Sequence, residues 1–147
     1  APVTADTWAT EVGVLGRHRP RLVTSWRPVA PGTSGAISVA GTLAAAAGAL
    51  FIGLVLYAVD HRAAGWIVPV ATAAGLVGCT VDSLLGATVQ AMYWSTQRGK
   101  LTERRTEPDG TANPLTRGLR WVGNDLVNFA SSLSGAAFGA VVAATLG

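Results

Sequence analysis

Charged side chains are scarce in this sequence and are confined to a few short segments. Only 13% of the 147 residues are Asp, Glu, Lys or Arg, whereas 50% are hydrophobic. Soluble domains carry about twice that fraction of charge. Of the 19 charged residues, six lie in 6–27, two in 60–62 and ten in 98–125, which leaves Asp82 alone in an apolar run. This distribution argues against a soluble or disordered chain and, despite the net charge of +3, against nucleic-acid binding.

Cysteine and histidine are also rare. The single Cys79 excludes an intramolecular disulfide or a cysteine-ligated zinc site, and His18 and His61 are too far apart in sequence to suggest a histidine metal site. No basic segment followed by an apolar core and a cleavage pattern indicates a signal peptide. The chain opens on APVTADTW without a methionine, so we expect it to be part of a longer protein.

Three uncharged or nearly uncharged runs are long enough to cross a membrane. They cover 36–59, 66–90 and 126–147, and about 20 helical residues span a hydrocarbon core of about 30 Å. We therefore predict an all-α fold, an integral membrane helical bundle with about three transmembrane helices plus a short N-terminal helix, in a single membrane domain over 1–147. The GxxxG spacing of Gly135 and Gly139 predicts close helix packing.

The basic residues predict how the chain lies in the membrane. Four arginines precede the first span, one lies in the turn at 60–62, and five arginines and a lysine lie in 98–120. By the positive-inside rule, segments 1–27 and 98–123 are cytoplasmic, in a bacterial-type inner (cell) membrane. Segment 98–120 is rich in turn residues and is expected to be a flexible, solvated connector that can meet anionic lipid headgroups.

Asp82 is the feature that packing explains least. A carboxylate within a membrane span costs at least about 2.5 kcal/mol unless it finds a partner or water. Asp82, Gly86 and Gln90 recur at every fourth position, which gives the helix one polar, closely approachable face. This pattern favours a functional Asp82, although an aspartate solvated at the membrane interface is the alternative.

Two further polar clusters are expected at the same membrane face. ADTWATEVG carries Asp6 and Glu11, and NDLVNFASS carries Asn124 and Asn128 on one side of a helix, with Asp125 beside them. An exposed turn and interhelical hydrogen bonds would explain each cluster taken alone.

Between these clusters lies PGTSGAIS, at 31–38, which is expected to open directly into a helix. Its free backbone N–H groups and hydroxyls would suit a phosphate. The candidate phosphate-binding residues are Gly32, Thr33, Ser34, Gly35, Arg21 and Arg27, with Arg17 and Arg19 as further candidates.

The candidate Mg²⁺ ligands are Asp6, Glu11, Asp82 and Asp125, and Asn124 and Asn128 could orient the ligands or the acceptor. Carboxylates, a phosphate turn and arginines together predict Mg²⁺ and nucleoside triphosphate chemistry, with Asp82, Asp6, Glu11, Asn124 and Asn128 as the catalytic candidates.

The same residues resemble the domain of unknown function 92 family of integral membrane proteins. Its members include vertebrate transmembrane protein 19 and the plant phytyl-phosphate kinase. The matching motifs are ADTWATEVG, PRLVTSWRPVAPGTSGAISVAGTLAA, GLVGCTVDSLLGATVQ and NDLVNFASS. The resemblance implies a kinase that uses CTP or another nucleoside triphosphate to convert a prenyl monophosphate to the diphosphate. It also implies that this chain is the C-terminal part of a longer protein.

Two other functions stay open at this point. In a transporter, Asp82 and Gln90 would line a polar pathway, although the outer half of the chain offers few polar residues beyond Asp60 and Thr72. In a non-catalytic scaffold, the polar clusters would only join helices. The prenyl chain, the nucleotide and the oligomeric state are not predicted.

Overall fold

Four helices and two small sheets make up the part of the chain that the structure describes. The computed structural model describes residues 1–15, 19–60 and 65–146. The helices are α1 (Pro2–Leu15), α2 (Val39–Val59), α3 (Ile67–Thr88) and α4 (Asn124–Leu146). The strands are β1 (Arg21–Leu22), β2 (Ala36–Ile37), β3 (Met92–Ser95), β4 (Lys100–Thr102) and β5 (Leu115–Arg117). The predicted helical membrane bundle, with three spans and a short N-terminal helix, is confirmed.

The three long helices have the length and composition of membrane spans. They contain 21, 22 and 23 residues, which at about 1.5 Å per residue is enough for a hydrocarbon core of about 30 Å. The Ser38 side chain caps the start of α2 by accepting a hydrogen bond from the Gly41 N–H at 3.0 Å. Pro69 lies in the first turn of α3, where no helical hydrogen bond is lost.

Small residues allow α1, α3 and α4 to meet closely. A Cβ atom on Gly135 of α4 would lie 2.5 Å from the Ala74 carbonyl oxygen of α3, and one on Gly78 would lie 2.5 Å from the Pro2 Cβ of α1. Gly139 also faces Ala74. The packing role expected for Gly135 and Gly139 is thus confirmed, and replacing Gly135 would force the helices apart.

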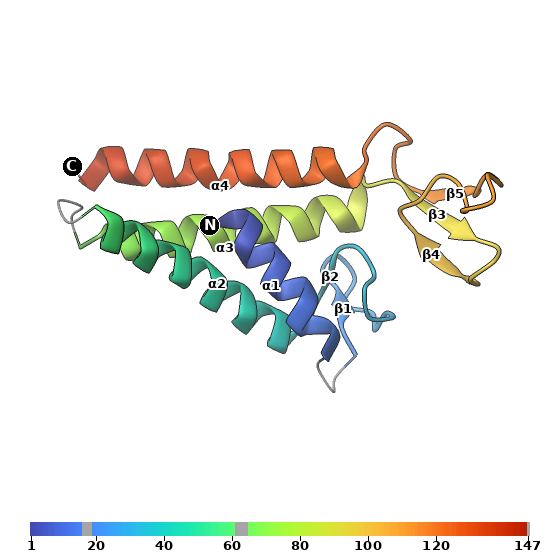
Figure 1. Ribbon diagram of the computed structural model, residues 1–147, viewed down its shortest axis with the longest axis horizontal. Helices are drawn as coiled ribbons and strands as arrows, with labels where there is room; N and C mark the ends of the chain where they lie inside the picture. The colour runs from blue at the N-terminus through green and yellow to red at the C-terminus, as the bar shows by residue number, and fades with distance from the viewer. Residues whose placement is uncertain (16–18, 61–64, 147) are drawn as a thin grey trace.

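The short helix α1 packs against the bundle through Ala5. Figure 1 shows α1 running beside α2, with its first residue near the middle of the helical body. Ala5 is fully buried and packs with Ala45 and Ala49 of α2. Because Asp6 follows Ala5, the packing of α1 carries a carboxylate into the bundle.

Segment 98–120 is not the flexible connector that its turn residues suggested. Strand β3 pairs with β4 and with β5 in an antiparallel three-stranded sheet beyond the ends of α3 and α4. Ser95 of β3 and Glu107, in the loop between β4 and β5, are buried, and the Ser95 hydroxyl donates a hydrogen bond to the Glu107 carboxylate. Buried polar pairs of this kind hold the segment in one conformation, which composition alone does not reveal.

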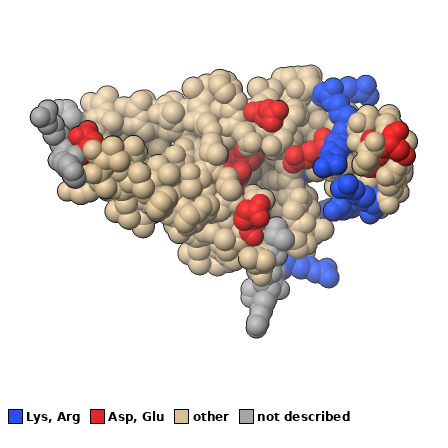
Figure 2. Space-filling model, in the orientation of Figure 1, with Lys and Arg blue, Asp and Glu red and all other residues tan. Residues whose placement is uncertain are grey.

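The Lys and Arg side chains in view gather toward one end of the molecule. Figure 2 shows them over the end that carries the strands, whereas none is visible along most of the helical body. The three spans therefore lie between a basic end and an end where the described residues include Asp60.

Candidate functional site

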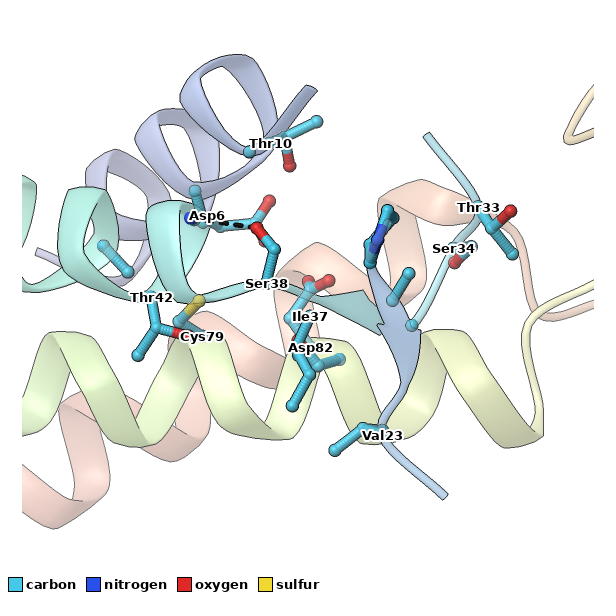
Figure 3. Close-up of a pocket in the computed structure, with 18 of the residues that line it drawn as sticks. Asp6, Thr10, Val23, Thr33, Ser34, Ile37, Ser38, Thr42, Cys79 and Asp82 are labelled. Carbon is cyan, nitrogen blue, oxygen red and sulfur yellow. Dashed lines mark hydrogen bonds between the residues drawn. The ribbon is translucent and has the colours of Figure 1, made fainter. Parts of the chain in front are cut away.

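A cavity of about 560 Å³ opens beside α1, α2 and α3. Turn 31–35 and strand β2 form another wall, and Glu103, Asn124 and Asn128 complete it from the sheet and from α4. Figure 3 shows the side chains of Asp6 and Asp82, from α1 and α3, pointing into the space between these elements. Residues more than 100 positions apart in the sequence therefore share one polar chamber.

Most of the predicted site residues line this cavity. Those brought together are Asp6, Glu11, Gly32, Thr33, Ser34, Gly35, Asp82, Asn124 and Asn128. Asp125 lies in the first turn of α4 but does not line the cavity, and neither do Arg19, Arg21 and Arg27. Arg17 lies outside the described residues.

The carboxylates from α1 and α3 influence each other. Burial raises the pKa of Asp6 to about 6, and the negative charges of Asp82 and Glu103 add to the shift. The Ser131 hydroxyl of α4 donates to Asp82 Oδ2 at 3.1 Å. Asp6 also borders a smaller cavity of about 80 Å³ on its α4 side, which Asn128 and Ser131 line. The cavity thus gathers negative charge that a cation would neutralise.

The glycine-rich segment at 31–38 opens directly into a helix, as predicted, and it also contains a short strand. Ala36 and Ile37 form β2, Ser38 caps α2, and α2 begins at Val39. The backbone of Gly35 has a φ of +78°, and a Cβ there would lie 2.3 Å from the Ala87 nitrogen of α3. Glycine at this position therefore lets the turn lie directly on α3.

The polar face predicted for the second span is confirmed. Asp82 lines the cavity, a Cβ on Gly86 would lie 2.6 Å from the Ser34 hydroxyl oxygen, and Gln90 accepts a hydrogen bond from that hydroxyl at 2.6 Å. This face of α3 and the residues just after it therefore meet the turn.

Two site residues lie in the segment that the sequence suggested was a connector. Glu103, after β4, lines the cavity and accepts a hydrogen bond from Gln90 Nε2 at 2.9 Å. Partial burial raises the pKa of Glu103, the bond from Gln90 opposes the shift, and the charges of Asp82 and Asp125 add to it. No sequence pattern distinguishes Glu103 from the other charged residues around it.

Arg117 is the second of these residues, and it contacts the turn that carries the predicted phosphate-binding residues. Its guanidinium donates to the carbonyl oxygens of Ala87, Gly86 and Ser34 at 2.9–3.1 Å. Arg21 instead donates to the Trp26 carbonyl of its own turn at 2.7 Å. Arginine thus holds the turn in place from behind, while the cavity lining contains no Lys or Arg among the described residues.

The side chains suit a metal that is held only in part by protein. Among the described residues, no three His, Cys, Asp or Glu side chains form a group that could hold a metal ion. Mg²⁺, however, usually takes one or two carboxylates together with waters and substrate phosphates. Asp6 and Asp82 line one cavity, and burial together with the charges of Asp82 and Glu103 raises the pKa of Asp6, so a bound cation would stabilise its charged form. The donor set therefore fits Mg²⁺ carried on a phosphate.

Comparison with known proteins gives one family and several long relatives. The family model described as integral membrane protein DUF92 matches residues 1–136. Protein PGR of Arabidopsis thaliana is 35% identical over 138 residues, which are 87% of this chain and 46% of the relative. An uncharacterised membrane protein of Methanocaldococcus jannaschii is 44% identical over 89 residues, covering 59% of this chain and 36% of the relative. No solved structure matches.

Another uncharacterised membrane protein, from Synechocystis, is 38% identical over 93 residues, covering 63% of this chain and 36% of the relative. The chain thus spans less than half the length of these relatives. The family match covers the motifs around Asp6, Gly32, Asp82 and Asn124 and the strand-forming segment between them. The chain belongs to the DUF92 family of integral membrane proteins.

Proposed function

We propose that this chain is the C-terminal part of a membrane-embedded kinase that converts a prenyl monophosphate to the diphosphate. The observation that carries the proposal is the cavity where Asp6 and Asp82 lie opposite a Gly/Ser-rich turn, beside three helices long enough to cross a membrane. Such a chamber suits a substrate with an anionic end and an apolar tail. The resemblance to plant phytyl-phosphate kinase agrees with this substrate class.

The acidic residues that line the cavity determine how a phosphate group would bind there. Asp6, Glu11, Asp82 and Glu103 would repel a bare phosphate, because the described lining supplies no Lys or Arg. When bound, Mg²⁺ would supply positive charge that neutralises the carboxylates and the phosphate. Asp6 and Asp82 would hold it, with Glu103 or Glu11 as a further oxygen donor, and Asp125 is left outside this set.

The remaining residues would position the two substrates. An oxygen of the prenyl phosphate attacks the γ-phosphorus of CTP or another nucleoside triphosphate, and the bond to the β-phosphate oxygen breaks to release the nucleoside diphosphate. The attacking oxygen is already anionic, so orientation and charge neutralisation matter more than a strong base. The 32–35 turn would hold phosphate oxygens, and Asn124 and Asn128 would orient the acceptor.

The apolar part of the cavity would hold the start of the prenyl chain. Ala45 of α2, Leu76 and Cys79 of α3, and Ile37 of β2 line it next to the polar groups. Because α2 and α3 are membrane helices, the remaining tail would leave the cavity among apolar helix faces in the bilayer. The phosphate chemistry would take place at the cytoplasmic face.

Enzyme assay of the full-length protein in proteoliposomes tests this function. We expect a prenyl diphosphate to form from the monophosphate when Mg²⁺ and one of CTP, ATP, GTP or UTP are present, and EDTA to stop its formation. Absence of diphosphate across chain lengths of 10 to 20 carbons would reject the proposal. Ion-dependent solute uptake without nucleotide would favour a transporter instead.

Asp82→Asn is the variant that best tests the site. It keeps the size of the side chain and an oxygen for Ser131, but it removes the charge, so we expect phosphoryl transfer to fall by at least about 100-fold. Asp109→Asn is the matched control, because Asp109 lies on the surface of the sheet, bonded to Thr111 and Gln97. Equal activity in the two variants would remove Asp82 from the metal site.

A further inference from the structure

Gln90 connects three parts of the cavity wall without lining the cavity. It lies two residues beyond the end of α3, and only 1% of its surface is exposed. The Ser34 hydroxyl donates to Gln90 Oε1 at 2.6 Å, and Gln90 Nε2 donates to Glu103 Oε1 at 2.9 Å. Nε2 also lies 3.5 Å from Asn124 Oδ1. Ser34, Glu103 and Asn124 all line the cavity.

The chemistry of the carboxamide determines what its partners can do. A glutamine side chain has an acceptor at one end and donors at the other. The proton of the Ser34 hydroxyl is directed to Gln90, which leaves the oxygen lone pairs for a cation in the cavity. One oxygen of Glu103 is held by Nε2, so the second oxygen is available to a ligand. Gln90 thus leaves the Ser34 hydroxyl oxygen and one Glu103 carboxylate oxygen free to accept a ligand in the cavity.

The backbone around Gln90 is itself held in place. The Gln90 N–H donates to the Leu85 carbonyl at 3.1 Å, and the next N–H, of Ala91, donates to the Val122 carbonyl at 2.8 Å. A Cβ on Gly118 would lie 2.0 Å from the Gln90 carbonyl oxygen, so the chain after β5 packs directly on this backbone. The backbone that carries the Gln90 carboxamide is therefore held rigidly between the last turn of α3 and the sheet.

We propose that Gln90 is a positioning residue for phosphoryl transfer, which holds Ser34 and Glu103 so that their oxygens face the metal–phosphate group. The three-stranded sheet thereby contributes a wall of the site and an acidic side chain to it. This inference rests on the proposed function, and it assigns to the site a residue that touches neither substrate nor metal.

Gln90→Met in the full-length protein is the first test, with Mn²⁺ as a spectroscopic probe for the Mg²⁺ site. Methionine has nearly the same length and removes both hydrogen bonds. Loss of such outer partners weakens metal binding or activity by about 10–100-fold. We expect Mn²⁺ binding, followed by electron paramagnetic resonance without turnover, to weaken in that range, and kcat to fall while KM for the prenyl phosphate is unchanged.

Gln97→Met provides a control with the same substitution. Gln97 Nε2 also donates to a carboxylate, that of Asp109, at 2.6 Å, but this pair is exposed on the sheet, and neither residue lines the cavity. Mn²⁺ binding and turnover should match the wild type. Wild-type Mn²⁺ binding in Gln90→Met would overturn the inference.

A charge-swapped pair separates positioning from folding. The double variant Gln90→Glu with Glu103→Gln keeps one amide and one carboxylate, so a hydrogen bond can re-form with its direction reversed. We expect its thermal stability to stay near that of the wild type and its Mn²⁺ binding to stay weak, because the carboxylate no longer faces the cavity. Wild-type Mn²⁺ affinity in this variant would show that Gln90 only supports the fold and would overturn the proposal.

The two readouts also separate this inference from the proposed reaction. Mn²⁺ binding that depends on Gln90, in a protein that forms no prenyl diphosphate, would reject the reaction and keep the positioning role. Diphosphate formation with wild-type kinetics and Mn²⁺ affinity in Gln90→Met would keep the reaction and reject the positioning role.

Discussion

Single acidic residues control the electrostatics of the cavity. Asp6, Glu11, Asp82 and Glu103 line it, and no Lys or Arg accompanies them among the described lining residues. Asp6 responds most clearly, because burial and two like charges raise its pKa to about 6. A cation that binds here would lower this pKa again, since it stabilises the charged carboxylate. Metal binding and proton release at Asp6 are therefore expected to be linked.

The raised pKa of Asp6 predicts how stability depends on pH without metal. Between pH 3.8, its ordinary value, and about 6, the folded protein binds more protons at Asp6 than the unfolded chain does. The contribution of Asp6 to the free energy of unfolding therefore falls as pH rises through this window. In EDTA, we expect Asp6→Asn to raise the melting temperature relative to wild type more at pH 7.5 than at pH 4.5.

Circular dichroism or scanning fluorimetry of the detergent-solubilised protein measures this difference. Comparing wild type with Asp6→Asn at each pH removes the contributions of groups that titrate in both proteins. Asp125→Asn serves as the matched control, because Asp125 is exposed and does not line the cavity. A pH-independent difference between wild type and Asp6→Asn would contradict the burial and like-charge repulsion at Asp6.

At the scale of elements, α3, the glycine-rich turn and the sheet meet at Arg117. The guanidinium at the end of β5 donates to two carbonyls of the last turn of α3 and to the Ser34 carbonyl. Carbonyls at a helix end have no partner within the helix. Burial lowers the pKa of Arg117, and these carbonyl dipoles stabilise its charge in return. The Arg117 side chain thus holds the three-stranded sheet in a fixed position relative to α3.

Arg117→Met is expected to destabilise the protein by about 1–3 kcal/mol, because it leaves carbonyl groups without donors. Activity should fall with it, since Ser34 loses the contact that holds its backbone. Arg120→Met is the control, because the Arg120 side chain is exposed. Thermal unfolding and diphosphate formation are measured in both variants. Equal stability of the two variants would show that Arg117 does not stabilise the contact between the sheet, the turn and α3.

At the scale of the whole molecule, the helices could be predicted from the sequence and the sheet could not. The runs at 36–59 and 66–90 contain α2 and α3, and the run at 126–147 contains all of α4 except its first two residues, because apolar length alone determines a span. The strands β4 and β5 have three residues each, too few for an alternating pattern to stand out. Their partner β3 begins only four residues after α3 ends, so the apolar run does not indicate where the helix ends and the strand begins.

The arrangement of the cavity residues could be predicted where the residues belong to one motif and share a helix face. Asp82, Gly86 and Gln90 share a face because they repeat at helical spacing. Ser34 and Gln90 lie 56 positions apart in the sequence, and their hydrogen bond depends on the turn lying against α3. Glu103 and Arg117 reach the site only through the sheet. Local patterns therefore predicted which residues share a helix face, and long-range packing determines how they pair across the sequence.

The distribution of charge over the molecule makes a prediction about its orientation. Among the described residues, the arginines and lysines in view gather at the strand end, and the opposite end holds the end of α2, with Asp60, and the start of α3. Because positively charged segments stay on the cytoplasmic side, we expect the sheet and the cavity to face the cytoplasm, where nucleoside triphosphates are found. The C-terminal end of α4 would then lie outside, since α4 begins beside the cavity and crosses the membrane once.

Labelling of single cysteines can test this orientation in the full-length protein, in a background without other cysteines. Asp109→Cys places the probe in the loop between β4 and β5, and Asp60→Cys places it after α2. In intact bacterial cells, a membrane-impermeant maleimide should label Asp60→Cys and spare Asp109→Cys, and inverted vesicles should show the opposite pattern. Labelling of Asp109→Cys in intact cells would place the carboxylates outside, away from cytoplasmic nucleotide, and the kinase proposal would fail with the orientation.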